Sequence, residues 1–170
     1  MLASGGIVLH ATEGVWGFAA DPTLLPAVDR ILELKGRSAN KGFILIAGSA
    51  DVFTTQLATL SRSHRAQILS TWPGAHTWVL PDDEFSPIIR GYRNTVACRV
   101  PGHGQARALC QLYNAALVST SANLAGQPAV TTAAAAFDLF GDRVDFFLPG
   151  EVKNPGQAST IYGLDGQILR

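Results

Sequence analysis

The chain has 170 residues, of which 13 are basic and 13 acidic, so its formal net charge is zero. This balance argues against the overall basic field of non-specific nucleic-acid binders, and any RNA affinity would need a local basic patch. The composition, 47% hydrophobic and 15% charged, is that of a globular protein and excludes a disordered chain. We therefore expect a single domain over residues 1–170.

Cysteine usage and the first residues of the chain predict the compartment. Cys98 and Cys110 form no C-x-x-C pair, which suits reduced thiols better than a disulfide framework. The chain starts without a charged leader, and no run approaches about 18 apolar residues. We expect a soluble cytoplasmic protein without membrane contact. The four histidines show no metal-ligand spacing, so no protein-held metal is predicted.

The expected secondary structure alternates between strands and helices. Apolar runs without period-two alternation indicate buried strands, and apolar residues at helical spacing indicate helices. Such an alternation is typical of an α/β sheet covered on both faces, with ligands bound beyond the strand ends. In chain order we expect a strand over 7–9, a helix over 24–35, a strand over 42–48, helices starting near 49 and 61, strands over 76–80 and 94–100, a helix over 105–113, a strand over 116–118, a helix over 131–140 and a strand over 144–148. The chain then ends with the segment 159–164 and a short glycine-turned tail.

Three cations and two glycines stand between the first expected helix and the next strand, in the segment 35–42. Lys35 and Arg37 could simply offset the dipole of the preceding helix. They could also form an anion cradle with Lys41, because glycines let backbone amides approach an oxyanion. The order of residues is not a Walker A motif, and no G-x-G-x-x-G follows a strand. These common nucleotide motifs are excluded, although nucleotide binding is not.

A row of uncharged polar residues, Ser119, Thr120, Ser121 and Asn123, is expected at the end of the strand over 116–118. Such side chains can cap the turn that follows a strand. They can equally hold an acyl or phosphoryl oxygen without forming a competing ion pair. No G-x-S-x-G elbow surrounds either serine, so an activated serine nucleophile is not expected.

Two further places leave alternatives open. The glycines around Trp16 are compatible with an ordinary tight connection, or with an aromatic ring that walls a small-molecule pocket. Arg99 stands in an otherwise apolar strand and therefore needs either a buried ion pair or an anionic ligand.

Taken in order, six segments of the chain resemble the YrdC/TsaC family, the threonylcarbamoyl-AMP synthases. The segments are ATEGVWGFAADP, LKGRSANKGFILIA, WPGAHTWVLP, TVACRVP, LVSTSANLAGQP and ASTIYGLDGQILR, and they span almost the whole chain. The residues that match the family's motifs are Thr12 and Glu13 of P-T-E-[ST]-x-[YF]-G, Lys35 and Arg37 of K-x-R, and Ser121 and Asn123 of S-x-N.

The sequence also departs from the family's pattern. Ala11 stands where proline is usual, Trp16 replaces tyrosine or phenylalanine, and Lys41 with Gly42 replaces the commoner Pro-Leu. The resemblance implies a YrdC-like fold, a twisted open mixed α/β sheet flanked by helices with a concave, locally positive ligand-binding surface. It also implies the short, single-domain form of the family.

The resemblance implies a nucleotidyltransferase that makes L-threonylcarbamoyl-AMP and pyrophosphate from L-threonine, bicarbonate or CO₂, and ATP, for N6-threonylcarbamoyladenosine modification of tRNA. ATP would be a substrate that brings Mg²⁺ with it. The tRNA and its modification proteins would act downstream. By this resemblance, catalytic roles are expected for Lys35, Arg37, Ser121 and Asn123, and substrate or ATP contacts for Thr12, Lys41, Thr77, Arg99 and Ser119.

Two other functions are alternatives to this one. The first is an RNA-binding or ribosome-maturation factor without its own catalysis, which would bind RNA by shape and phosphates on the concave surface. The zero net charge counts against strong RNA affinity. The second is carbamoyl transfer from carbamoyl phosphate, as in hydrogenase-maturation relatives with a similar domain. Those relatives carry zinc-finger and acylphosphatase modules, for which this chain has neither C-x-x-C pairs nor the length.

Overall fold

The structure is a computed structural model that describes residues 1–169. Eight strands among these residues form one sheet. The strands are β1 (Val8–Ala11), β2 (Trp16–Ala20), β3 (Ile44–Ile46), β4 (His76–Pro81), β5 (Thr95–Arg99), β6 (Leu117–Ser121), β7 (Phe146–Phe147) and β8 (Thr160–Tyr162).

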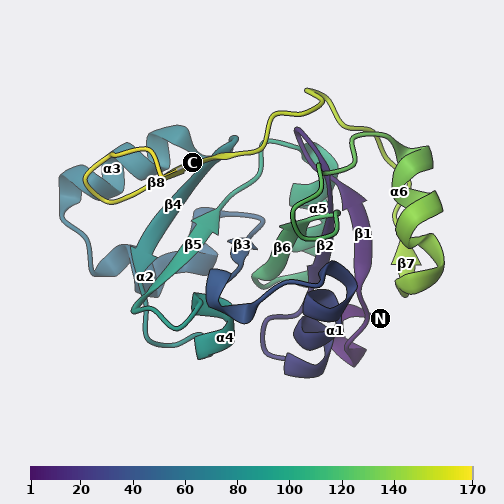
Figure 1. Cartoon of the computed structure of the whole chain (residues 1–170). Coiled ribbons are helices and arrows are strands. Elements are labelled where there is room, and N and C mark those ends of the chain that lie inside the picture. The colour runs from purple at the N-terminus through teal and green to yellow at the C-terminus, as the bar shows by residue number, and fades with distance from the viewer. Residues whose placement is uncertain (170) are drawn as a thin grey trace.

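The sheet is mixed and open. Its strand order is β7-β1-β2-β6-β3-β5-β4-β8, so strands distant in the chain lie side by side (Figure 1). The pairs β1–β2, β2–β6, β3–β6 and β4–β5 are antiparallel, whereas β1–β7, β3–β5 and β4–β8 are parallel. The predicted mixed α/β sheet is therefore confirmed.

Short helices flank the sheet. Helix α1 (Leu25–Lys35) ends where the sequence predicts. Gly36 follows it in the left-handed conformation, at φ 58°, and its N–H donates back to the carbonyls of Glu33 and Leu32. No helix within residues 1–169 is both long and apolar enough to cross a membrane. The α-helices are α1 (Leu25–Lys35), α2 (Thr54–Ala58), α3 (Arg62–Thr71), α4 (Pro87–Arg90), α5 (Gly104–Tyr113) and α6 (Ala133–Phe140), and the 3₁₀ helices are η1 (Leu2–Ser4), η2 (Ala39–Lys41), η3 (Ala50–Phe53) and η4 (Gly141–Arg143).

Apolar residues pack against both faces of the sheet. Along β6, Val118 belongs to the larger core cluster and its neighbour Leu117 to the smaller one, because successive side chains of a strand point to opposite faces. Ile31 of α1 lies in the larger cluster, and Cys110 of α5 in the smaller. The unbroken apolar runs of the sequence follow from this two-sided burial.

The sequence did not predict strand β2. Its Gly17 suggested a connection, but this glycine lies within the strand, where an added Cβ would stand 3.0 Å from the Thr120 carbonyl oxygen of β6. Trp16 is fully buried and stacks on Phe147, with ring centroids 4.9 Å apart. The ring is therefore part of the core and walls no pocket. The short helix α4 was also not predicted.

The polar run after Val118 lies differently from the prediction. Ser119, Thr120 and Ser121 do not follow the strand but belong to β6 itself, where Ser121 pairs with Gly17 of β2. The apolar run predicted a shorter strand because polar residues in a central strand are unexpected unless a cavity lies over them.

A long connection crosses the molecule between β7 and β8. This strap, residues 149–159, passes over the top of the view in Figure 1 from the β7 side to the β8 side. Asn154 N–H donates to the Glu13 carbonyl at 2.7 Å, and Gly156 N–H to the Gly14 carbonyl at 2.9 Å. A Cβ on Gly14 would stand 1.6 Å from the Gln157 carbonyl oxygen, so only glycine lets the strap approach so closely.

Candidate functional site

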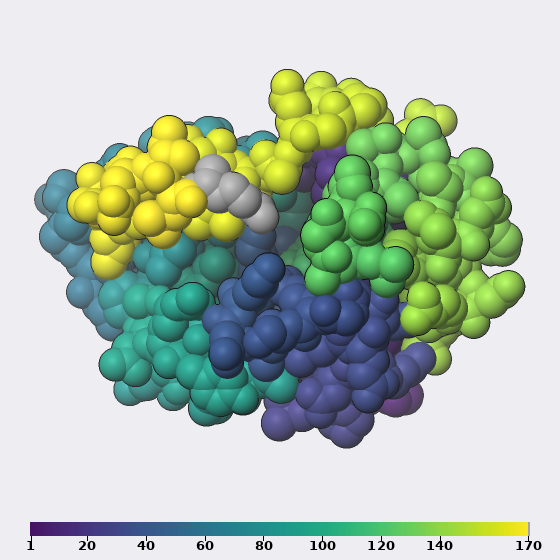
Figure 2. All heavy atoms as spheres, viewed as in Figure 1, coloured from purple at the N-terminus to yellow at the C-terminus, as the bar shows by residue number. Residues whose placement is uncertain are grey.

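A cavity of about 370 Å³ lies over the middle of the sheet. Figure 2 shows the molecule hollowed there, between the blue segment after α1, the green loop after β6 and the yellow chain near the C-terminus. The floor comes from three strands: Ile44 of β3 pairs directly with Ala97 of β5 and with Ser119 of β6. Directly paired residues share one face of a sheet, so these three side chains lie together.

The structure brings nearly all the predicted site residues to this cavity. Thr77 is the exception: its side chain is fully buried behind the lining, and its hydroxyl is hydrogen-bonded to that of Ser159 at 2.9 Å. Ser159 itself lines the cavity. The predicted residues that line it are Thr12, Lys35, Arg37, Lys41, Arg99, Ser119, Ser121 and Asn123.

Lys35, at the end of α1, is buried against the end of β6. Its ammonium donates to the Ser121 carbonyl, to the Asn123 carbonyl at 3.1 Å and to Asn123 Oδ1 at 2.9 Å. The Lys35 carbonyl in turn accepts the N–H of Ala125 at 2.7 Å. Lys35 therefore ties the end of α1 to the loop after β6, and this is why two motifs far apart in sequence meet.

Ser121 and Asn123 are bonded to each other as well as to Lys35. The Ser121 hydroxyl lies 2.6 Å from Asn123 Oδ1. Asn123 Nδ2 donates to the carbonyls of Leu124 and Gln127 at 2.9 and 2.7 Å. The side chains of the S-x-N motif are thus held in one arrangement.

Arg37 forms the next part of the wall. Its guanidinium donates to Thr120 Oγ1 at 2.9 Å and to the Gly42 carbonyl at 2.7 Å, and it lies over the Phe43 ring, 5.4 Å from the centroid. Packing on an aromatic face and fixed hydrogen bonds limit the freedom of this side chain. Arg37 therefore presents a positioned charge to the cavity.

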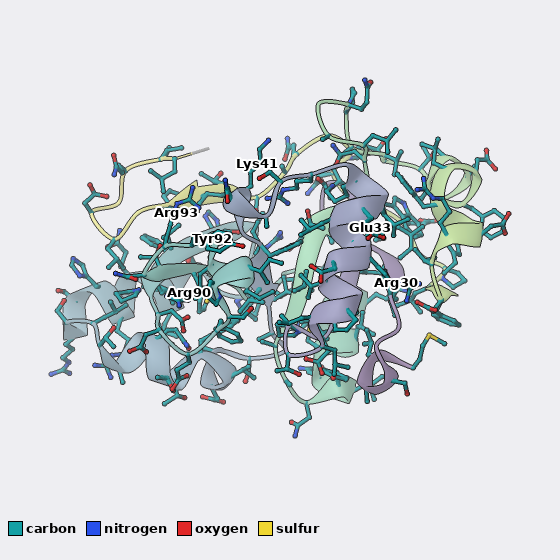
Figure 3. The ribbon with its side chains drawn as sticks, turned by 60° about the horizontal axis from the view of Figure 1, so that its bottom comes forward. Arg30, Glu33, Lys41, Arg90, Tyr92 and Arg93 are labelled. Atoms are coloured by element: carbon teal, nitrogen blue, oxygen red, sulfur yellow. The ribbon has the colours of Figure 1, made fainter. Side chains whose placement is uncertain are left out.

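Lys41 ends η2 at the rim, and its side chain is exposed. The η2 turn is supported from the side, because Gly42 at φ 63° packs backbone to backbone on Gly91, after α4. Figure 3 labels Lys41 on this turn, with Tyr92 and Arg93 on the supporting loop. Glycine is required at both contacts, where a Cβ would stand within 3.0 Å of the other loop. The rim is therefore built from two loops that brace each other.

The three cations act on one another. The pKa of Lys35 is lowered from its ordinary value of 10.5 to about 8, first by burial and then by the charges of Arg37 and Lys41. Burial and like charges both disfavour the ammonium. An anionic ligand would relieve this repulsion, so the cavity suits a polyanion.

Arg99 takes part in a buried ion pair, one of the two alternatives that the sequence left open. Its guanidinium lies 2.5 Å from Glu13 Oε1, and its Nε donates to the Gly74 carbonyl at 2.8 Å. Glu13 Oε1 also accepts the N–H of Gly102 at 2.6 Å. Because Arg99 also lines the cavity, the pair joins one cavity wall to the β1–β2 loop that holds the strap.

The strap supplies lining residues that motif reasoning missed. Gln157, Ala158 and Ser159 line the cavity, and Ile161 of β8 continues this wall. No nucleotide or catalytic motif marks them. The only signal in the sequence was the last of the segments of family resemblance, which begins at Ala158.

The described residues form no group of three or more His, Cys, Asp or Glu side chains able to hold a metal ion. The lining is instead cationic and hydroxyl-bearing. Such a lining suits the phosphates and carboxylates of a ligand, and a divalent ion would arrive as part of that ligand.

Comparison with known proteins agrees with this geometry. A family model named Sua5_yciO_yrdC and described as "Telomere recombination" matches residues 1–170. The chain belongs to the Sua5/YciO/YrdC family. It is 42% identical over 172 residues to the threonylcarbamoyl-AMP synthase of Nitrosococcus oceani, covering 100% of this chain and 93% of that protein. It is 38% identical over 172 residues to the synthase of the same name from Hahella chejuensis, covering 100% and 94%.

Solved structures of the Sua5/YciO/YrdC family share the fold. The P. abyssi Sua5 structure complexed with L-threonine superimposes with a TM-score of 0.91 at 30% identity, over 99% of this chain. The chain spans about half the length of that Sua5, 51%. E. coli YciO has a TM-score of 0.79 at 18% identity over 95% of this chain and 79% of YciO, which shows the fold alone. The YrdC-like fold expected from the sequence is confirmed.

Proposed function

We propose that this protein is a threonylcarbamoyl-AMP synthase, which forms L-threonylcarbamoyl-AMP and pyrophosphate from L-threonine, bicarbonate or CO₂, and ATP. The observation that supports this most is the single cavity in which the K-x-R and S-x-N residues meet. Relatives with this name align over nearly their whole length, and P. abyssi Sua5 was solved with L-threonine.

The reaction needs little covalent chemistry from the protein. The neutral amine of threonine attacks CO₂, a C–N bond forms, and a proton leaves to solvent. A carbamate oxygen then attacks the α-phosphorus, the bond to the β-phosphate breaks, and pyrophosphate departs. Positioning the reactants and offsetting phosphate charge are what such a transfer requires.

The cavity residues are assigned to this reaction by their position and charge. Arg37 offsets the triphosphate charge, Lys41 assists it at the rim, and Lys35 adds to the positive field. Mg²⁺ enters with ATP. Ser121 and Asn123 lie next to the carbamate and the α-phosphate. Contacts with threonine and its carboxylate are assigned to Thr12 and Arg99. Ser119 contacts the substrates from the floor of the cavity, and Thr77 acts indirectly, through its hydrogen bond to Ser159 in the lining.

The product would be passed to tRNA for N6-threonylcarbamoyladenosine synthesis by partner proteins, and the protein would act in the cytoplasm as one domain over residues 1–170. The alternative of an RNA factor without catalysis has less support, because the relatives with high coverage bear the synthase name. Carbamoyl transfer from carbamoyl phosphate gains no support from these relatives either.

Isotope labelling tests the proposal. The purified protein is incubated with ATP, Mg²⁺, L-threonine and ¹³C-bicarbonate, and products are identified by mass spectrometry. We expect an adenylate that contains threonine and one ¹³C, absent when threonine is omitted. A folded, ATP-binding preparation that forms no such adenylate would overturn the proposal.

A further inference from the structure

An exposed tyrosine with a strained backbone stands on the loop after α4. Tyr92 follows the left-handed Gly91 and is itself left-handed, at φ 61°, a conformation that bulky side chains rarely adopt. Its N–H donates to the Pro87 carbonyl at 2.8 Å, which holds the backbone in this shape. The ring takes no part in the core, because the residue is 64% exposed. Such strain is typical of functional sites, and here it presents an aromatic ring to the outside.

Two cations lie beside this tyrosine, on the two loops that brace each other. A Cβ on Gly91 would stand 2.7 Å from the Asn40 carbonyl oxygen and 2.8 Å from Arg93 Nη1, so the Arg93 guanidinium lies at the contact between the loops. Lys41 and Arg93 are both exposed, and neither side chain forms a hydrogen bond or an ion pair within residues 1–169. Figure 3 labels both cations and the tyrosine on these loops. We call Lys41, Tyr92 and Arg93 the rim patch.

Both loops belong to segments without acidic residues. Asp and Glu are absent from residues 34–50 and from residues 85–137. The carboxylate of Asp82, which contacts Arg90 of α4 at 3.7 Å, is itself fully buried. The rim patch is therefore a local excess of positive charge on a chain whose net charge is zero. Such a patch is complementary to an anionic surface of a partner.

The rim patch adjoins the cavity from which the product must leave. Lys41 and Gly42 line the cavity, whereas Tyr92 and Arg93 stand outside its lining, so the patch extends from the mouth onto the outer surface. The proposed product is a mixed anhydride of a carbamic and a phosphoric acid, and in water it would be lost to hydrolysis. The reaction that consumes it is a group transfer: an amine nitrogen bonds to the carbamoyl carbon, the C–O bond to phosphate breaks, AMP leaves, and a proton passes to solvent. An enzyme of this class that docks at the mouth would receive the product before water destroys it.

We propose that the rim patch is a docking surface for an acidic face of the enzyme that accepts the threonylcarbamoyl group. The proposal rests on the proposed function. Tyr92 is the anchor, because tyrosine and arginine are enriched among the residues that dominate protein–protein binding, and a held aromatic ring loses little entropy. Lys41 and Arg93 pair with carboxylates of the partner and steer its approach.

A protein fits the rim patch better than RNA does. Proteins that bind nucleic acids tightly contact many phosphates, and most of their affinity depends on those contacts. The rim patch offers two cations and one ring, and the zero net charge of the chain adds no wider basic field. Two charges around one aromatic anchor are instead what a transient protein interface uses.

The docking surface is tested with Tyr92→Gly and Arg93→Glu, beside Arg62→Glu on exposed α3 as the charge control. Glycine is favoured at φ 61°, so Tyr92→Gly removes the ring, keeps the backbone and should leave Tm near that of wild type. The probe is the purified transferase that moves the threonylcarbamoyl group to tRNA, and its binding is measured by biolayer interferometry. We expect about tenfold weaker binding for Tyr92→Gly and Arg93→Glu, and wild-type binding for Arg62→Glu. High salt should reduce the effect of Arg93→Glu more than that of Tyr92→Gly.

The same variants separate docking from synthesis. Tyr92 and Arg93 stand outside the cavity lining, so threonine-dependent pyrophosphate release should remain within about twofold of wild type. With the transferase and unmodified tRNA present, the share of the adenylate that reaches tRNA rather than water should fall in Tyr92→Gly and Arg93→Glu and not in Arg62→Glu.

The outcomes distinguish this inference from the proposed function. Wild-type protein without threonine-dependent pyrophosphate release would overturn the proposed function. If the wild type is active but does not bind the transferase, or binds it no better than Tyr92→Gly and Arg93→Glu do, the docking inference is wrong. Variants that lose binding of tRNA alone, while the transferase still binds, would assign the rim patch to RNA and also overturn the inference.

Discussion

Two clusters of charged and polar residues border the cavity, and each contains a buried cation. In the motif corner, formed by Lys35, Arg37, Ser121 and Asn123, cations bond to neutral oxygens of the protein. In the strap anchor, formed by Glu13, Arg99 and Gly102, the cation pairs with a carboxylate whose Oε2 has no hydrogen-bond partner within residues 1–169. The corner keeps its positive charge available to a ligand. In the anchor, the charge of Arg99 is paired with that of Glu13, and the pair holds chain segments together while Arg99 still lines the cavity.

This difference predicts that changes in the anchor act mainly on stability and changes in the corner mainly on activity.

Breaking the anchor should be the most damaging single change. Arg99→Met leaves the Glu13 carboxylate buried and unpaired, which costs about 3–5 kcal/mol. For a chain of this size that loss lowers Tm by about 6–20 °C. Thermal unfolding measures it, and the double variant Glu13→Gln/Arg99→Met should be less destabilised than the sum of the single variants. A Tm within about 2 °C of wild type for Arg99→Met would contradict the role of the anchor.

In the corner, Arg37→Ala should cut kcat/KM by about 10²–10³-fold, because a positioned charge at the phosphates is lost. Tm should change little, because water in the cavity can hydrogen-bond to the Thr120 hydroxyl and the Gly42 carbonyl once Arg37 is removed. Pyrophosphate release and thermal unfolding are measured on the same preparation. Near-wild-type activity in a folded variant would remove Arg37 from the reaction.

The pH dependence should separate activity from stability at Lys35. With a pKa of about 8 in the folded protein and 10.5 as the ordinary value, the unfolded chain binds more protons between these two pH values. The contribution of Lys35 to stability therefore rises with pH in this window and is constant below it. Activity should fall across the same window, because a neutral amine cannot supply three protons to its acceptors. The pH profiles of stability and of activity are compared between wild type and Lys35→Met, and their difference isolates the contribution of Lys35. If the two proteins have parallel profiles, this prediction is wrong.

The smallest effect is expected at the rim. Lys41→Ala removes an exposed charge, which should raise the KM for ATP by about 2–5-fold and leave Tm unchanged. High salt should reduce the difference between variant and wild type. A larger rise in the KM for ATP that does not depend on salt would contradict this prediction and place Lys41 inside the motif corner rather than at its edge.

The corner was predictable from the sequence, whereas the anchor was predictable only in part. Lys35 and Arg37 stand in one short segment and Ser121 and Asn123 in another, so two motifs sufficed. The position of Arg99 in an apolar strand predicts that it has an anionic partner. The partner, Glu13, lies far away in the chain, and only the fold brings the two together. Three-dimensional contact is not encoded in local spacing.

The strap illustrates the same limit. Its path depends on the approach of Gln157 to Gly14 and on backbone hydrogen bonds, which any sequence without proline at those positions could make. Strand β2 is not predictable from the sequence because glycines are typical of tight connections, whereas the small size of Gly17 permits close contact between strands.

The central claim is that the cavity transfers the adenylyl group of ATP to a carbamate of threonine. The most direct test is pyrophosphate release from ATP, Mg²⁺ and bicarbonate, with and without L-threonine, by wild-type protein and Arg37→Ala. We predict release that depends on threonine in the wild type and is nearly abolished in the variant. Equal release with and without threonine, or no release from folded protein that binds ATP, would contradict the claim.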